Sequence, residues 1–258
     1  MSIRLGNSAL LFKCFAGCDT LDVLRELRTI DTRVFETVSG AGDASQIAAR
    51  QDWLRGRARD LWDQARPLGG TLAQAYLESR SLNARAQGLR FARRAPLGPR
   101  RSVIYRPALI AALHDAGRLV AVQRMFFEEG LGQLASDLGN PRRLLGRPLG
   151  GAVILTRASE VLGLAEGVET AMSAALLLGI PVWATLGSER LPHITVPESV
   201  TRLLILPDND RAGRLGARKA MAAYARSGRT VETVWPPSGF NDWNDVLRSD
   251  GDSALSAV

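Results

Sequence analysis

Short apolar runs alternate with amphipathic stretches over residues 160–248. Strands that alternate with helices form right-handed βαβ units on a parallel sheet. We therefore predict an α/β fold, with a Rossmann-like parallel sheet and flanking helices over residues 160–250. The expected strands are VLGLA, VWATL, RLLIL and TVETVW, and the expected helices span about 169–178, 211–226 and 242–248.

The preceding residues have a different pattern. Residues 1–30 indicate a short strand, LLFKCF, a tight turn and a helix. Residues 31–88 indicate a linker, a long helix at 45–66 and a shorter helix with Thr71 as its cap. In residues 89–159, two β-rich runs flank Asp115-Ala116-Gly117 and predict a hairpin. Because this stretch is also rich in arginine, we expect a basic α+β subdomain after a helical N-terminal segment.

The composition favours binding to a polyanion. The net charge is +7, and nearly all of the 33 basic residues are arginine, since only Lys13 and Lys219 are lysines. Arginine binds phosphate with a planar fork and stacks on bases, although a GC-rich genome also enriches arginine. No apolar run reaches the ~18 residues of a membrane span, and no signal peptide is recognisable, so we expect a cytoplasmic protein with no membrane partner.

Five acidic residues near the carboxyl end are the strongest indication of chemistry. Glu166, Asp208 and Asp210 follow predicted strands, and Asp242 and Asp245 open the last predicted helix. At the carboxyl ends of parallel strands, side chains face the crevice where ligands bind, and carboxylates gathered there repel one another unless a cation lies between them. Oxygen ligands suit Mg²⁺ or Mn²⁺. The pattern therefore favours a phosphoryl-transfer site that acts on nucleic acid.

Each motif also has a plainer interpretation. Glu166 can be a solvated loop carboxylate, the Asp208-Asn209-Asp210 segment can be a turn and a helix cap, and Asp242 can cap the last helix. A cationic stripe follows on the next helix, and it suits either a nucleic-acid backbone or a triphosphate, or else a solvated helix face. The stripe consists of Arg211, Arg214 and Arg218, with Lys219 beside it.

Together, the motifs EGVET, DNDRAG and DWNDVL, in this order and spacing, resemble the Toprim domain of bacterial, plasmid and phage primases over about residues 150–248. Upstream, AYLESRSL resembles a helix-and-loop motif that precedes the catalytic core of such primases. The resemblance implies that Glu166 acts in acid–base chemistry or metal binding, and that Asp208 and Asp210 hold Mg²⁺. It also implies that Asp242 and Asp245 lie near a second metal ion.

The resemblance extends to the basic region and to the N-terminus. The basic residues 89–150 correspond to the subdomain that faces template and nucleotide, which makes Arg124, Arg142 and Arg143 candidate nucleic-acid contacts. LLFKCFAGCDTLDVLRELR resembles the second half of a zinc ribbon. The first ligand pair is absent, and Cys14 and Cys18 alone cannot complete a tetrahedral site. We therefore expect a remnant of the ribbon and no zinc.

The resemblance implies a DNA primase-like nucleotidyltransferase that makes short RNA primers on single-stranded DNA from nucleoside triphosphates, with Mg²⁺ or Mn²⁺. A replicative helicase would be a separate chain, because no G-x-x-x-x-G-K-[ST] motif is present. Thr170 stands where replicative primases tend to carry an acidic residue. Two alternatives stay open, a Toprim nuclease and a catalytically inactive DNA-binding module of a mobile element. The primase-like upstream region favours the primase over the nuclease.

Overall fold

The computed structural model describes residues 2–5, 10–13, 44–98, 102–225 and 228–255 of the chain. The chain divides into two compact units, residues 1–52 and residues 53–258. The first unit contains an antiparallel hairpin of β1 (Ser2–Leu5) and β2 (Leu10–Lys13). The hairpin confirms the predicted strand over its first four residues. The predicted turn and helix after it, and Cys14 and Cys18, lie outside the described residues.

Two helices precede the main sheet. The first is α3 (Ala44–Gln64), which runs from the first unit into the second and confirms the helix expected at 45–66. The second is α4 (Leu72–Glu78), whose N-cap is Thr71 as predicted. The Thr71 hydroxyl accepts a hydrogen bond from the Gln74 amide at 3.4 Å, which satisfies one of the unpaired donors of the first helical turn.

The strands of residues 89–154 form an antiparallel arrangement around the predicted hairpin. Asp115 pairs with Arg118, so Ala116 and Gly117 form a two-residue turn, and both have positive φ angles, 46° and 77°. Such turns match the twist of paired strands, and the glycine relieves the strain at one of the two positions. The strands are β3 (Leu89–Leu97), β4 (Ile104–Asp115), β5 (Arg118–Phe126), β6 (Arg142–Gly146) and β7 (Ala152–Ile154).

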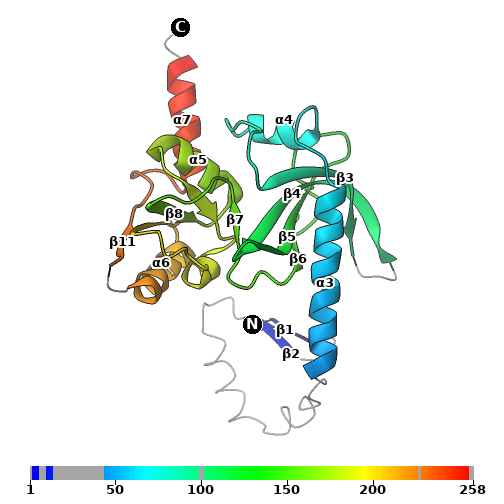
Figure 1. Ribbon diagram of the computed structural model, residues 1–258. Helices are drawn as coiled ribbons and strands as arrows, with labels where there is room; N and C mark the ends of the chain where they lie inside the picture. Colours follow the sequence, from blue (N-terminus) through cyan, green and yellow to red (C-terminus); the bar gives the residue numbers. More distant parts are fainter. Residues whose placement is uncertain (1, 6–9, 14–43, 99–101, 226–227, 256–258) are drawn as a thin grey trace. The chain divides into compact units, whose positions relative to one another are not determined.

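The remaining residues form the predicted α/β layer. Four strands lie parallel in the order β11-β10-β8-β9. Figure 1 shows α5 and α7 on one side of these strands and α6 on the other. The elements are β8 (Val161–Ala165), α5 (Val168–Leu178), β9 (Val182–Ala184), the 3-10 helix η2 (Ser188–His193), β10 (Arg202–Leu206), α6 (Arg211–Tyr224), β11 (Thr230–Thr233) and α7 (Trp243–Leu255). Thus the expected fold class is confirmed.

The burial of β10 explains why its sequence is an uninterrupted apolar run. Leu203 and Ile205 pack in a core with α6, whereas Leu204 and Leu206 pack in a core with α5 and the first residue of α7. Because successive side chains of a strand point to opposite faces, a strand covered by helices on both sides must be apolar at every position. The same reasoning applies to β8, which is its parallel neighbour.

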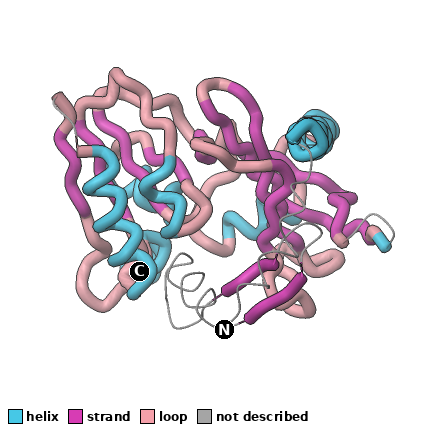
Figure 2. The backbone as a smooth tube through the Cα atoms, turned by 90° about the horizontal axis from the view of Figure 1, so that it is seen from below, coloured by secondary structure: helices cyan, strands magenta, loops and turns pink. Residues whose placement is uncertain are grey.

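The antiparallel strands and the parallel strands belong to one sheet. Within the described residues, nine strands join in the order β11-β10-β8-β9-β7-β4-β5-β6, with β3 paired to β4. The link is β7, which is antiparallel to β9 and also to β4, with Val153 opposite Ala184 on one side and opposite Leu113 on the other. Figure 2 shows the strands continuing from one half to the other. The shared sheet fixes the basic strands relative to the carboxyl ends of the parallel strands.

Candidate functional site

Two of the predicted carboxylates meet at the carboxyl edge of the parallel strands. Glu166 directly follows β8, and Asp208 lies two residues after β10. The two strands are neighbours, with Ala165 opposite Leu206. The Glu166 side chain reaches across, and its Oε1 accepts a hydrogen bond from the Asp208 backbone amide at 3.2 Å. The adjacent strand ends therefore bring together residues that are 42 positions apart in the sequence.

The five acidic residues Glu166, Asp208, Asp210, Asp242 and Asp245, here called the carboxylate cluster, influence one another electrostatically. Burial and the charge of Asp208 raise the pKa of Glu166 from 4.5 to about 7, and Asp210 adds to this effect. Burial raises the pKa of Asp208 from 3.8 to about 7, with further contributions from Asp242, Asp210 and Asp245. Shifts of this kind arise when like charges share a partly desolvated site, and they are common where carboxylates have a chemical role.

The helix-capping interpretations of two of these residues are confirmed. Asp210 is the N-cap of α6, and its Oδ1 accepts a hydrogen bond from the Gly213 amide at 2.7 Å. Asp242 Oδ1 accepts from the amides of Asn244 and Asp245 at 2.7 Å and 2.9 Å, at the start of α7. Capping uses one oxygen of each carboxylate in these contacts, so a cap does not exclude a second role for the residue.

A glycine lets α6 approach the carboxylate cluster closely. A Cβ at Gly213 would lie 2.1 Å from the Asp208 carbonyl oxygen and 2.9 Å from Glu166 Oε1. Any larger residue would therefore push the start of the helix away from the loop that carries Asp208. The glycine of the DNDRAG motif is thus required by packing at the site.

The residues are suited to hold a divalent cation. The Asp208 Oδ1 atom is buried and has no hydrogen-bond partner among the described residues, so a bound cation would supply the missing contact. No group of three or more His, Cys, Asp or Glu side chains in the described part of the chain is arranged to hold one metal ion. Mg²⁺ is often bound by one or two carboxylates and completed by water and phosphate oxygens. The assignment of all five carboxylates to metal binding therefore stays a prediction.

Glu166 and Asp208 line a pocket of about 570 Å³ that also contains two arginines of β6. Arg142 and Arg143 face the pocket from the antiparallel half of the sheet, together with Gln123 and other residues. The volume lies within the usual range for small-ligand sites, roughly 300–1,000 Å³. The pocket therefore places two predicted cationic residues opposite two predicted carboxylates.

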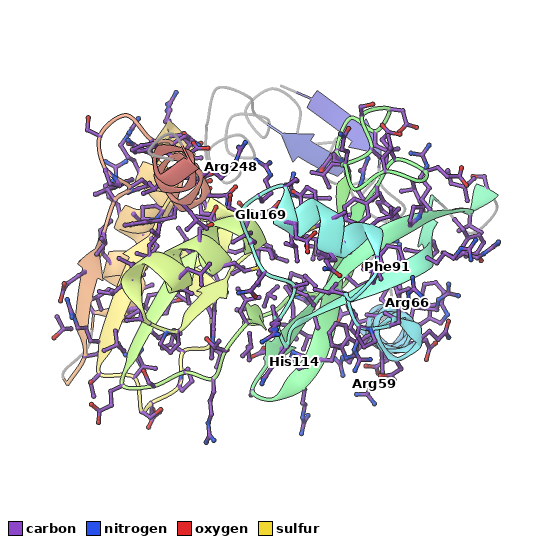
Figure 3. The ribbon with its side chains drawn as sticks, turned by 90° about the horizontal axis from the view of Figure 1, so that it is seen from above. Arg59, Arg66, Phe91, His114, Glu169 and Arg248 are labelled. Carbon is purple, nitrogen blue, oxygen red and sulfur yellow. The ribbon has the colours of Figure 1, made fainter. Side chains whose placement is uncertain are left out.

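A buried polar contact, which no sequence pattern predicted, joins the two halves of the sheet beside this pocket. Glu169 of α5 accepts a hydrogen bond from the Tyr76 hydroxyl of α4 at 2.5 Å and from Arg142 Nη2 at 2.6 Å. Glu169 is 8% exposed. Although burial acts to raise the pKa of Glu169, the Arg142 charge and these hydrogen bonds hold it below its ordinary value. Figure 3 shows Glu169 where α5 faces α4.

A second contact reinforces the same junction. The Asn244 amide of α7 donates hydrogen bonds to the Arg80 carbonyl at 2.9 Å and to the Ser173 hydroxyl of α5 at 3.0 Å. Tyr76 and Arg80 both belong to the AYLESRSL motif. That motif therefore attaches α4 to the domain that carries the carboxylate cluster.

The other predicted cationic residues lie elsewhere. The guanidinium of Arg124 donates to the carbonyls of Pro96 and Leu144 at 2.5 Å and 3.0 Å, and burial, with the charge of Arg143, lowers its pKa to about 10. These contacts join β5 to β3 and to β6, so any contact of Arg124 with DNA stays a prediction. The stripe on α6 lines a different pocket, with Lys219 exposed nearby; its members are Arg211, Arg214 and Arg218.

Every helix in the described residues is too short or too polar to cross a membrane. The prediction that the protein is cytoplasmic is not tested by that finding.

Comparison with protein families gives two matches that together span most of the second unit. Residues 52–155 match a family described as a domain of unknown function, DUF7146, and residues 161–253 match a family described as a Toprim domain. The comparison with curated proteins finds no match.

Comparison with solved structures finds primase catalytic regions. A DNA primase domain from Pseudomonas aeruginosa is 16% identical with a TM-score of 0.52, covering 79% of this chain and 77% of that one. A DnaG primase catalytic domain bound to ssDNA is 17% identical with a TM-score of 0.55, covering 83% and 81%. The primase fragment of the bacteriophage T7 primase-helicase protein is 13% identical with a TM-score of 0.51, covering 75% and 78%. At such identities the likeness shows a shared fold. Residues 161–253 form a Toprim domain, and the chain has the fold of a primase catalytic core.

Proposed function

We propose that this chain is a DNA primase-like nucleotidyltransferase that makes short RNA primers on single-stranded DNA. The observation that carries the proposal is the pocket in which Glu166 and Asp208 of the Toprim domain face Arg142 and Arg143 of the basic strands. Carboxylates that can hold a cation, opposite arginines that can hold phosphate, form a combination suited to a nucleoside triphosphate.

The proposed reaction is the attack of a primer 3′-hydroxyl on the α-phosphorus of an incoming nucleoside triphosphate. A new P–O bond forms, the bond between the α-phosphorus and the bridging oxygen breaks, and pyrophosphate leaves. Glu166, whose pKa lies near 7, is suited to accept the hydroxyl proton at neutral pH. Bound by Asp208 and Asp210, Mg²⁺ or Mn²⁺ would neutralise charge on the triphosphate, and Asp242 and Asp245 would lie near a second ion.

The basic strands would bind the triphosphate and the template. Arg143 and Arg142 line the pocket, and the ion pair with Glu169 holds the Arg142 guanidinium in place. Rigid placement of reacting groups supplies much of the rate enhancement in phosphoryl transfer. We assign the Tyr76–Glu169–Arg142 contact to that positioning role.

The proposal includes the surroundings of the catalytic region. Residues 89–159 would form the basic subdomain, preceded by the helices α3 and α4. Among the structural relatives, one primase is described as bound to ssDNA and another is part of a primase-helicase protein. A single-stranded template and a separate helicase are therefore the proposed partners, in the cytoplasm of a host that carries the gene on a plasmid or phage.

The test is primer synthesis on single-stranded DNA with labelled ribonucleotides and either Mg²⁺ or Mn²⁺. Wild type is compared with the double variant Asp208→Asn/Asp210→Asn, in which asparagine retains the ability to cap α6. The proposal predicts metal-dependent oligonucleotides from wild type and none from the variant. Cleavage of the template without synthesis would instead indicate a Toprim nuclease. DNA binding that persists in EDTA, with neither reaction, would indicate a catalytically inactive binding module.

A further inference from the structure

The cationic stripe of α6 lines a pocket that is separate from the carboxylate cluster. The pocket has a volume of about 580 Å³ and lies between α6 and the end of β11. Figure 1 shows these two elements side by side. We call this pocket the α6 groove. Its lining residues are Arg211, Arg214, Ala217, Arg218, Met221, Thr233 and Trp235.

The charge of the groove is not neutralised by the described part of the protein. Arg211, Arg214 and Arg218 are all exposed, and none of the three forms an ion pair with a described residue. Arg214 donates a hydrogen bond to the Asn209 side chain at 3.2 Å, but that partner is a neutral amide. Three exposed arginines on one helix face, none of them in an ion pair with a described residue, are suited to an anionic ligand.

The groove also contains an exposed aromatic ring. Trp235 follows β11 and is 37% exposed, while Ala217, beside it in the lining, is buried. An indole ring left open to solvent beside arginines is a surface on which a nucleic-acid base can stack. Because a base in a duplex is already stacked and paired, such a ring favours a single strand.

We propose that the α6 groove binds single-stranded DNA, with phosphates on the three arginines and a base stacked on Trp235. The stripe from Arg211 to Arg218 spans about 10 Å of helix axis, which is long enough to contact successive phosphates of one strand. Arg211 directly follows Asp210 of the carboxylate cluster, so the groove begins beside that cluster. A strand bound there would be held outside the pocket that receives the triphosphate.

This inference goes beyond primer synthesis, because strand binding in the groove requires neither a metal ion nor catalysis. It is tested in EDTA with the full chain carrying Asp208→Asn, so that a failure of the proposed reaction cannot affect the result. The measurement is the fluorescence anisotropy of a labelled oligothymidylate, repeated over a range of salt concentrations. The variants are Trp235→Ala, Trp235→Phe and the double variant Arg214→Gln/Arg218→Gln. The control is Arg157→Gln, an exposed arginine between β7 and β8.

Trp235→Ala should weaken binding about five- to a hundredfold, the usual effect of removing one stacking partner, whereas Trp235→Phe should retain most of the affinity. The double arginine variant should lower the slope of log affinity against log salt by about 1.4, since each phosphate contact on a single strand contributes about 0.7. Arg157→Gln should change the affinity and the salt slope much less than these variants do. Thermal melts establish that each variant is folded. If Trp235→Ala does not fold, the salt slope of the double arginine variant decides the matter.

Unchanged binding in Trp235→Ala and in the double arginine variant, or losses no larger than that of Arg157→Gln, would overturn the proposal. An equal loss of affinity for duplex and single-stranded DNA in Trp235→Ala would also overturn it, because stacking on the ring requires an unpaired base. Quenching of Trp235 fluorescence by an acidic peptide, but not by oligothymidylate, would assign the groove to a protein partner instead.

Discussion

Replacing Asp208 with asparagine should remove activity and at the same time stabilise the metal-free protein. The half-buried Asp208 carboxyl has its pKa raised from 3.8 to about 7 by burial and by the surrounding carboxylates. A rise of that size corresponds to about 4 kcal/mol of destabilisation when the group is ionised, and screening by solvent around a partly exposed side chain reduces it to about 2 kcal/mol. Because the folded pKa is above the unfolded value, the cost is absent at low pH and is complete only above about pH 7.

The assay is thermal unfolding in EDTA, followed by tryptophan fluorescence at pH 5 and at pH 8. Asp208→Asn should raise the Tm by about 4–8 °C at pH 8, from about 2 kcal/mol in a chain of this size, and by about one third as much at pH 5. Asp63→Asn, which changes an exposed carboxylate of α3, serves as the control and should shift the Tm at neither pH. A variant that is less stable than wild type at pH 8, or a gain that is the same at both pH values, would refute the electrostatic reasoning.

Three further predictions follow from the same contacts. Gly213→Ala should abolish primer synthesis and lower the free energy of unfolding by about 1–3 kcal/mol, because the new Cβ would lie 2.1 Å from the Asp208 carbonyl oxygen. Full activity in this variant would show that the close approach of α6 to the Asp208 loop is not needed. Mg²⁺ affinity, measured by calorimetry, should rise about tenfold from pH 6 to pH 8, since Asp208 must lose a proton with a pKa of about 7 before it binds the ion. A flat profile would contradict its role as a ligand. Glu169→Gln should lower the free energy of unfolding, measured in urea, by about 2–3 kcal/mol. This loss is below the range for a fully buried ion pair because the Arg142 side chain is 37% exposed. A loss under about 0.5 kcal/mol, as at ordinary surface sites, would argue that the Tyr76–Glu169–Arg142 contact does not stabilise the fold.

Most elements of the Toprim domain could be predicted from local pattern alone, but the 3-10 helix η2 and the extension of α7 beyond residue 248 were not predicted. RLLIL coincides with β10 because both faces of that strand are covered, so that every position had to be apolar. The β4–β5 hairpin was predictable from Asp115-Ala116-Gly117, whose turn requires positive φ angles. The meeting of Glu166 and Asp208 was also predictable, because carboxyl ends of neighbouring parallel strands share one edge.

The contacts between the halves could not be predicted in this way. Tyr76 and Glu169 are 93 residues apart, and each is unremarkable in its own segment, a tyrosine on a helix and a carboxylate in a first helical turn. Likewise, β7 is a three-residue strand whose role as the link comes entirely from its pairing with β4 and β9. Trp235 gave no signal either, since its exposure depends on how the residues after β11 leave the sheet.

The most direct test of the central claim is Mg²⁺-dependent formation of the first dinucleotides on single-stranded DNA by wild type and by Asp208→Asn, with folding and DNA binding measured on the same samples. The account predicts product from wild type alone, while the variant stays folded and binds DNA as before. Equal product from both proteins would contradict the assignment of the carboxylate cluster as the catalytic centre.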